Sequence, residues 1–187
     1  MVMLALPATT NAQGILAQWP LSVDFNTVTY NTTDFDNVQY SKGPGITEWN
    51  NFSLGGDWYS FTTDAAVDAN DYIGFNLKPA TGATAKNVYL THLELELRKW
   101  EFYGPGPLNY RIDYSKNSDF SSAVTVASGA LTLSFVIHDI QFNSPLEVFT
   151  GETIYFRIYA YSSGDGDLII KSNDFTFKGY IEPASAV

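Results

Sequence analysis

The chain has 187 residues, of which 45% are hydrophobic and 16% aromatic, which suits one domain with a substantial core and is too apolar for a disordered chain. Ten basic residues stand against 20 acidic ones, and a net charge of −10 argues against a nucleic-acid partner, which would require clustered cations. The absence of Cys excludes disulfides and thiolate metal sites, and two His residues are too few for a His-rich metal centre.

The two ends of the chain differ from its middle. Residues 1–12, MVMLALPATTNA, form a short apolar run followed by small and polar residues, which predicts the remnant of a secretory signal peptide without its basic start. The alternative is an irregular N-terminal strand. Residues 182–187, EPASAV, predict a C-terminal tail. No stretch approaches the ~20 apolar residues of a membrane-spanning helix, so we expect no membrane span in this chain.

The middle of the chain, residues 13–181, predicts a single all-β domain. No window holds apolar residues at helical spacing for three turns, whereas apolar and polar residues alternate at 93–98, 108–114 and 153–161. Further apolar segments lie at 15–25, 71–77, 168–170 and 175–180, and Gly-Asp-Gly-Asp at 164–167 predicts a hairpin turn. About ten strands in this order predict an antiparallel β-sandwich with jelly-roll topology. The polar, turn-rich segment 27–63 has weak strand signals and predicts long loops.

One predicted strand changes its alternation halfway. Leu93, Leu95 and Leu97 alternate with charged residues, but Val88 and Leu90 have the opposite parity. An extra residue near 91–92 would restore one common apolar face, because a β-bulge shifts the register by one. The sequence therefore predicts a bulge there.

Three segments of the chain resemble a known group of domains. Residues 71–82 read DYIGFNLKPATG, residues 90–99 read LTHLELELRK, and residues 110–115 read YRIDYS. This series resembles β-sandwich domains of exported proteins in Bacteroidetes and in bacteria that use the Pro-Glu-Pro sorting signal, which residues 181–185, IEPAS, match in part. The resemblance implies an exported or cell-surface domain similar to carbohydrate-binding modules or adhesin domains. It implies no catalytic residues.

Aromatic side chains in polar, turn-rich surroundings are candidates for sugar binding. Rings of Trp and Tyr stack on the apolar faces of sugars, and nearby polar side chains bond the hydroxyl groups. The alternative for each ring is packing in the core, which we expect for Trp19. The candidate carbohydrate-binding residues are Trp49, Trp58, Trp100, Tyr103, Tyr155, Arg157 and Tyr159.

A group of carboxylates precedes one predicted strand. Asp64, Asp68 and Asp71 fall within eight residues, and calcium takes six to eight oxygen ligands, so these residues predict a structural Ca²⁺ site. The spacing does not match an EF-hand loop. The alternative is an acidic loop exposed to solvent.

Catalysis has little support in the sequence. Glu94 and Glu96 would lie about 6.5–7 Å apart on one strand face, a separation compatible with the ~5–9.5 Å of glycosidase carboxylates. A cross-strand ion ladder with Arg111 explains them more simply. Neither His92 nor His138 belongs to a nucleophile motif. We therefore expect no enzyme.

Two functions remain open from the sequence. The first is an exported, non-catalytic module that binds a glycan through its aromatic residues. The second is a structural subunit or adhesin domain of a cell-surface assembly, in which exposed aromatics and strand edges mediate self-association. One concave cluster of aromatics with polar neighbours would favour the first.

Overall fold

The structure is a computed structural model that describes residues 13–20, 27–49, 57–60, 66–100, 107–161, 166–170 and 175–184, without the side chains of 47–49, 57–60, 100 and 166–170. In chain order the strands are β1 (Gly14–Trp19), β2 (Thr29–Tyr30), β3 (Phe35–Lys42), β4 (Ile46–Trp49), β5 (Asp57–Ser60), β6 (Tyr72–Pro79), β7 (Lys86–Trp100), β8 (Asn109–Ser115), β9 (Val124–Ala130), β10 (Val136–Val148), β11 (Ile154–Tyr161), β12 (Gly166–Ile170) and β13 (Phe175–Pro183). One 3₁₀ turn, Gly82–Thr84, joins β6 to β7.

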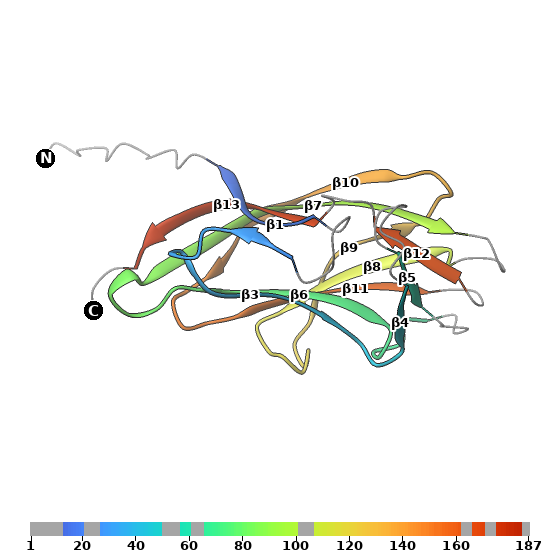
Figure 1. The fold of residues 1–187 in the computed structure, drawn as a ribbon, viewed down its shortest axis with the longest axis horizontal. Helices are drawn as coiled ribbons and strands as arrows, with labels where there is room; N and C mark the ends of the chain where they lie inside the picture. Colours follow the sequence, from blue (N-terminus) through green and yellow to red (C-terminus); the bar gives the residue numbers. More distant parts are fainter. Residues whose placement is uncertain are drawn as a thin grey trace, which may run out of the picture.

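The strands form two antiparallel sheets that lie face to face (Figure 1). The larger sheet contains β1, β13, β7 and β10 in that order, and the smaller contains β6, β11, β8 and β9. From β6 onward the chain crosses repeatedly between the sheets. The four strands just named in each sheet lie in the order of an eight-stranded jelly roll. The predicted β-sandwich and its jelly-roll topology are therefore confirmed. Strand β3 extends the smaller sheet beyond β6, and β2 extends the larger beyond β1.

The long strand β7 organises the larger sheet. Strand β13 pairs with its first part and β12 with its end, along the same side, while β10 pairs with the other side. Against β13, the adjacent residues Lys178 and Gly179 pair with His92 and Leu90, so Thr91 is the extra residue. The pairing of β10 shifts at the same point of β7, between Gln141 and Leu146. The predicted bulge is confirmed, and its physical result is that Val88 and Leu97 lie on the same buried face.

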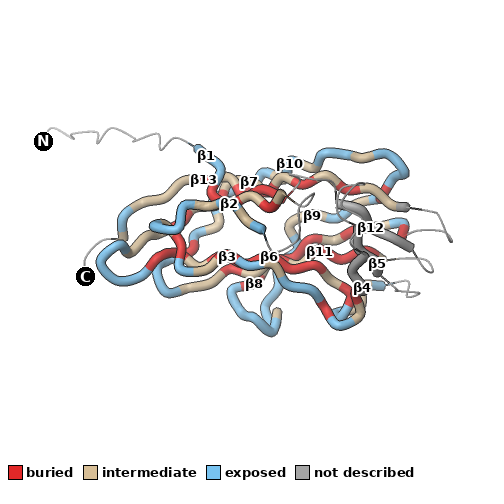
Figure 2. Tube along the Cα trace, in the orientation of Figure 1, coloured by how far each residue is buried: buried red, intermediate tan, exposed pale blue. Residues whose placement is uncertain are grey.

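The core fills the space between the two sheets, where the buried residues follow the strands of both layers (Figure 2). Aromatic rings join the layers. Phe75 of β6 stacks on Phe175 of β13 with ring centroids 3.5 Å apart, and Phe156 of β11 contacts Phe177 at 4.8 Å. Trp19 is fully buried, with its ring edge-on to Phe75 at 4.9 Å, so its predicted core position is confirmed. Such ring contacts add about 0.5–1.5 kcal/mol each to area burial.

The structure corrects several details of the sequence-based expectations. It contains thirteen strands in its described part rather than about ten, because segment 27–63 holds four strands as well as loops: β2, β3, β4 and β5. The predicted hairpin at 164–167 is wrong, since β11 and β12 lie in different sheets. Strand β13 runs to Pro183, and a proline fits at the end of a strand because it needs no ladder donor.

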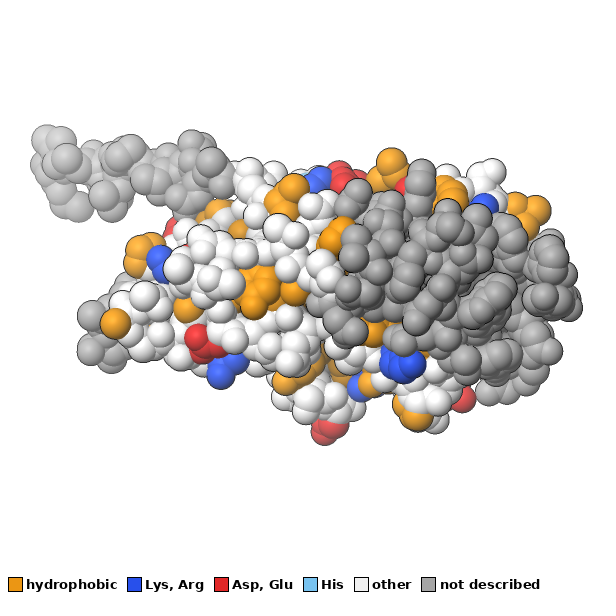
Figure 3. Space-filling view, viewed as in Figure 1, with side chains coloured by type: hydrophobic (Ala, Val, Ile, Leu, Met, Phe, Trp, Pro, Cys, Tyr) orange, Lys and Arg blue, Asp and Glu red, His pale blue; other side chains and the backbone are white. Residues whose placement is uncertain are grey.

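On the face of the molecule that Figure 3 draws, the described residues carry separate apolar groups. Figure 3 shows apolar side chains on this face in several small groups between polar ones, rather than in one continuous patch. No helix within the described ranges is long and apolar enough to cross a membrane.

Candidate functional site

The outer face of the smaller sheet carries the polar and aromatic side chains that alternate with its core residues. On β11, Ile154, Phe156 and Ile158 are buried in the core, so Tyr155, Arg157 and Tyr159 lie on the opposite face. The predicted alternation of this strand is confirmed. The loop between β8 and β9, residues 116–123, projects from the same face (Figure 1).

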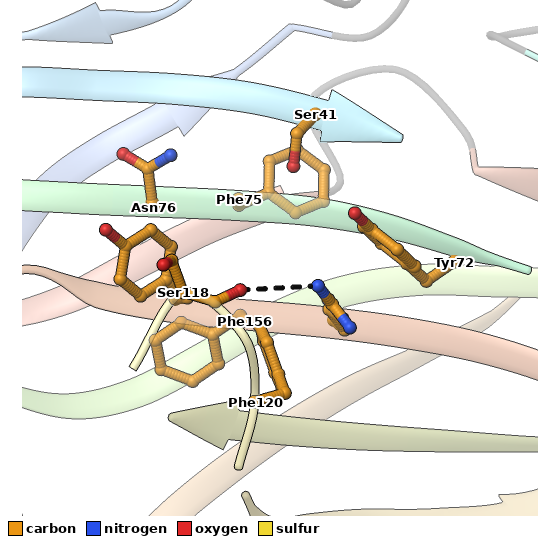
Figure 4. Close-up of a pocket in the computed structure, with 9 residues that line it drawn as sticks. Ser41, Tyr72, Phe75, Asn76, Ser118, Phe120 and Phe156 are labelled. Carbon is orange, nitrogen blue, oxygen red and sulfur yellow. Dashed lines mark hydrogen bonds between the residues drawn. The ribbon is translucent and has the colours of Figure 1, made fainter. Parts of the chain in front are cut away.

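A small cavity lies where this loop covers strands β3, β6 and β11. Its volume is about 180 Å³. Side chains reach it from three strands and the loop, as Figure 4 shows for Ser41 of β3, Tyr72 of β6 and Phe120 of the loop. The described residues lining the cavity are Ser41, Tyr72, Phe75, Asn76, Ser118, Phe120, Tyr155, Phe156 and Arg157.

Arg157 lies between two aromatic rings at the wall of the cavity. Its guanidinium carbon is 3.9 Å from the ring centroid of Tyr72 and 3.9 Å from that of Phe120. Both distances are within the range of cation–π attraction. The guanidinium also donates from Nη2 to the carbonyl oxygen of Ser118 over 3.5 Å, the dashed line in Figure 4. The two rings therefore hold the guanidinium in place, while its N–H groups make a long hydrogen bond to Ser118 and interact with the hydroxyl of Tyr159.

Phe120, the loop residue whose ring covers Arg157, has an unusual backbone conformation. Phe120 has φ of 58°, and within the described ranges it is the one residue other than glycine with a positive φ. A bulky residue in this region costs of order 1–3 kcal/mol, and such strain gathers at ligand clamps and active sites. The loop thus holds the Phe120 ring over Arg157 in spite of local strain.

Strand β6 carries a glycine opposite Arg157 and a buried amide that lines the cavity. Gly74 is the direct cross-strand neighbour of Arg157 on β6, and a Cβ there would collide with the hydroxyl of Ser41. Glycine therefore leaves room between the side chains of β3 and β11. Asn76 is 9% exposed, and its Oδ1 has no hydrogen-bond partner. A buried acceptor without a partner is costly, so a donor brought by a ligand would stabilise it.

Tyr159 differs from the two other predicted residues of β11. It is 4% exposed, its ring meets the edge of Tyr72 at a centroid distance of 6.2 Å, and Arg111 lies over it at 5.2 Å. Burial is the main reason why the pKa of its hydroxyl is raised above 10.0. Tyr159 therefore supports Tyr72 from beside the cavity and does not line it.

A wider, more open hollow adjoins the cavity. Its volume is about 520 Å³, and Ser118 and Tyr155 line both spaces. Lys116 on its rim forms an ion pair of 2.7 Å with Glu152, and Asp119 accepts a hydrogen bond from the backbone N–H of Ser121. That bond holds the pKa of the Asp119 carboxyl below its ordinary value. Tyr155 thus lies between the cavity and the more open hollow.

The structure brings together part of the predicted sugar-binding set. Tyr155 and Arg157 line the cavity. The side chains of Trp49, Trp58 and Trp100 lie outside the described part, as does the whole of Tyr103, so the predictions for these four residues remain predictions. Sequence reasoning missed Tyr72, Asn76 and Phe120. The cross-strand register of β6 and β11 brings Tyr72 and Asn76 to the site. No local pattern in the sequence indicates that these two strands pair.

The predicted calcium residues are only partly described. Asp64 lies outside the described ranges. Asp68 accepts a hydrogen bond of 2.7 Å from the backbone N–H of Asn70, and Asp71 is buried. Among the described residues, no three acidic or His side chains gather closely enough to hold a metal ion. The calcium site remains a prediction.

The remaining charged candidates have structural partners. Glu94 pairs with Lys178 of β13 at 2.6 Å, whereas Arg111 lies in the other sheet and pairs with Asp113, so the expected ladder between Glu94 and Arg111 is wrong. The Nδ1 atom of His138 lies 3.1 Å from the hydroxyl of Tyr110. Burial lowers the pKa of His138.

Comparison with known proteins gives structural neighbours but no family. No family model matches the chain, and no curated protein matches it. A CBM29-2 mutant, from carbohydrate-binding module family 29, complexed with mannohexaose, is 14% identical with a TM-score of 0.46, over 89% of this chain and 92% of that one. CBM32-1 from a family 31 glycoside hydrolase of Clostridium perfringens is 19% identical with a TM-score of 0.42, over 78% and 96%.

A third neighbour is the family 32 module of C. perfringens NanJ in complex with galactose, 10% identical with a TM-score of 0.40, over 87% of this chain and 99% of that one. The structural neighbours named here are thus carbohydrate-binding modules. Likeness at this level supports no inference about a ligand.

Proposed function

We propose that this chain is a non-catalytic module that binds carbohydrate on the outer face of its smaller sheet. The observation that carries the proposal is the position of Tyr155, which lines both the cavity and the wider, more open hollow beside it. With one sugar unit in the cavity, the next unit of the same oligosaccharide would lie in the hollow, along the Tyr155 ring. Concave sites with aromatic walls and a few convergent polar groups are the usual form of small-ligand sites.

The polar groups around Tyr155 suit sugar hydroxyls. Arg157 supplies N–H donors, Asn76 an unpartnered carbonyl oxygen, and Ser41 a hydroxyl that can donate or accept. The rings of Tyr72 and Phe120 contact Arg157, so Tyr155 is the ring proposed to stack on the sugar.

The test is a binding measurement with Tyr155→Ala. Soluble oligosaccharides from a glycan array would be titrated into the full chain by isothermal calorimetry, and the variant should bind at least tenfold more weakly. Tyr89→Ala is the matched control, because Tyr89 stacks on Tyr180 in the larger sheet. Absence of any glycan binding by the unchanged chain, or an equal loss in both variants, would contradict the proposal.

Self-association is the second candidate, favoured by one observation. Within the described part, β10 pairs with β7 alone, so it forms an edge of the sheet. Ile137 on this edge is 67% exposed, and Val136 is exposed beside it. Open strand edges can pair with a second copy. Light scattering after size exclusion would separate the two candidates. A dimer that dissociates in the Ile137→Lys variant would support self-association, and a monomeric unchanged chain would contradict it.

Export to the cell surface belongs to the same proposal. It is supported by the apolar segment at 1–12 and by the resemblance of residues 71–115 to exported domains. Expression of the full chain in a bacterial host, followed by N-terminal sequencing of the periplasmic protein, tests it. Retention in the cytoplasm with residues 1–12 intact would contradict it.

A further inference from the structure

We infer that the cavity selects a sugar unit that carries a carboxylate, a hexuronic acid, and that Arg157 is the residue that selects it. This inference rests on the proposed function and narrows its ligand from carbohydrate in general to acidic carbohydrate. It is carried by the charge, the geometry and the hydrogen-bond partners of the cavity wall.

The charge of the cavity is opposite to that of the chain. Arg157 is the one charged side chain among the described residues that line the cavity, although the chain has 20 acidic and ten basic residues. Its cross-strand neighbour on β8 is Asp113, but both oxygens of that carboxylate accept other hydrogen bonds, from Arg111 and from the hydroxyl of Thr125, at 2.7 Å each. Within the described part, no carboxylate lies within 4.0 Å of the Arg157 guanidinium.

The geometry leaves N–H donors of the guanidinium for a ligand. The guanidinium carbon of Arg157 lies 3.9 Å from the ring centroids of both Tyr72 and Phe120, so these two rings cover part of the guanidinium surface. Of the guanidinium N–H donors, one makes the long bond to Ser118, and the side chain also interacts with the hydroxyl of Tyr159, so the remaining donors of the fork are left for a ligand. Such a fork matches the two oxygens of a carboxylate in a bidentate arrangement. Because the rings hold the guanidinium in place before binding, less conformational entropy is lost when the ligand arrives.

The rest of the wall fits the sugar ring rather than a second anion. The unpartnered Oδ1 of Asn76 can accept a hydrogen bond from a sugar hydroxyl, and it repels a carboxylate. A hexuronic acid offers both groups, a carboxylate for Arg157 and ring hydroxyls for Asn76. A neutral sugar offers Arg157 only hydroxyl oxygens, which are weaker acceptors.

The sizes of the two spaces point to one selected unit in a longer chain. The cavity of about 180 Å³ is below the ~300–1,000 Å³ of pockets for drug-sized ligands, so it suits a single monosaccharide. The open hollow of about 520 Å³ continues past Tyr155 and leaves room for neighbouring units. The ligand class is therefore an oligosaccharide that contains uronic acid.

The test compares an acidic oligosaccharide with its neutral counterpart. Trigalacturonate and the same trisaccharide with its carboxylates reduced to alcohols would be titrated into the full chain by calorimetry at about 150 mM salt, which screens distant charges. We expect at least tenfold tighter binding of trigalacturonate. A sulfated neutral trisaccharide distinguishes a carboxylate from any anion, and it should bind no better than the neutral sugar.

Three variants assign the preference to one residue. Arg157→Gln should abolish the preference, so that the variant binds the acidic and the neutral sugar equally, and Arg157→Lys should reduce the preference, because Lys keeps the charge but not the fork. Lys78→Gln removes a positive charge from β6 outside the cavity lining and should change nothing. Circular dichroism checks that each variant folds. If Arg157→Gln does not fold, the test rests on Arg157→Lys, which should show a smaller preference for the acidic sugar than the unchanged chain.

The outcomes separate the inference from the function beneath it. Equal binding of acidic and neutral sugars, equal binding of the sulfated sugar, or a preference that survives Arg157→Gln would overturn the inference while leaving the carbohydrate site in place. Absence of binding to any sugar would overturn the proposed function itself.

Discussion

Arg157 and Asp113 are direct cross-strand neighbours on β11 and β8, yet no ion pair joins them, although the structure describes both side chains. Asp113 instead binds Arg111 and Thr125, and Arg157 turns to the rings of Tyr72 and Phe120. One arginine on this face is thereby neutralised by a buried carboxylate, and the other keeps its charge at the wall of a cavity. The difference between the two is the basis of the proposed site.

Asp113→Ala should destabilise the fold. Its carboxylate is buried and holds two hydrogen bonds, one of them to a charged group, and bonds of that kind contribute about 1.5–3 kcal/mol. Thr125→Val removes only the second bond and should cost about 1 kcal/mol. Denaturation in urea measures both. Equal stability of the two variants would contradict the role assigned to the Arg111 pair.

Two substitutions of Phe120 test its contact with Arg157 and the strain of its backbone. Phe120→Ala and Phe120→Gly both remove a cation–π contact with Arg157, of the order of 0.5–2 kcal/mol, and both should weaken glycan binding. Glycine adopts a positive φ without strain, so Phe120→Gly should unfold at a higher temperature than Phe120→Ala. The melting temperatures and binding constants of the two variants provide the comparison. The reverse order of melting temperatures would argue against strain at this residue.

His138 should make stability depend on pH. Burial lowers its pKa from 6.5, so the unfolded chain takes up this proton before the folded chain does. Stability should therefore fall as the pH drops from about 7.5 through 6.5 toward the lowered pKa. Glu152 and Asp119, whose pKa values are lowered from 4.5 and 3.8, contribute a further loss only below that range.

Calorimetric melting temperatures of the unchanged chain and of His138→Gln, measured from pH 7.5 to 5, test this dependence. The variant should show a flatter profile. Tyr110→Phe keeps the histidine while removing its hydroxyl partner, and it should retain the slope. A slope unchanged in His138→Gln would assign the dependence to another group.

Gly179 is required beside the bulge of β7. A Cβ at this position would collide with the backbone carbonyl of Tyr89, which has no room to move within the paired strands. Gly179→Ala should lower stability by about 1–3 kcal/mol. Gly14→Ala is the matched control, because nothing lies near its Cβ position. Unfolding curves for both variants measure the difference, and a tolerated Gly179→Ala would show that the bulge can relax.

The predicted calcium site has a direct test. If Asp64, Asp68 and Asp71 hold Ca²⁺, adding calcium should raise the melting temperature, and Asp68→Asn should weaken that response. Titration after treatment with EDTA measures it, with magnesium as the control, since Mg²⁺ prefers a stricter octahedral geometry. A melting temperature indifferent to EDTA and calcium would exclude a structural ion in this loop.

Local pattern in the sequence predicts the fold class and several details of it. Period-two alternation identified β8 and β11, the change of parity at Thr91 located the bulge, and Trp19 was expected in the core. These features follow from neighbours along the chain, because side chains of a strand alternate between its two faces whatever it pairs with. The hairpin predicted at 164–167 is wrong because turn-forming residues indicate a reversal of the chain but not which strands pair, and β11 and β12 lie in different sheets.

The candidate site depends on pairing between distant strands. Tyr72 and Asn76 reach Arg157 because β6 pairs with β11, some 80 residues later in the chain, and Phe120 arrives on a loop from a third strand. Nothing local in the sequence separates Arg111, which finds a buried carboxylate, from Arg157, which finds two rings. The sequence by itself thus determined which side chains face outward. Only the tertiary structure decided which of them meet, because cross-strand register and loop closure set those contacts.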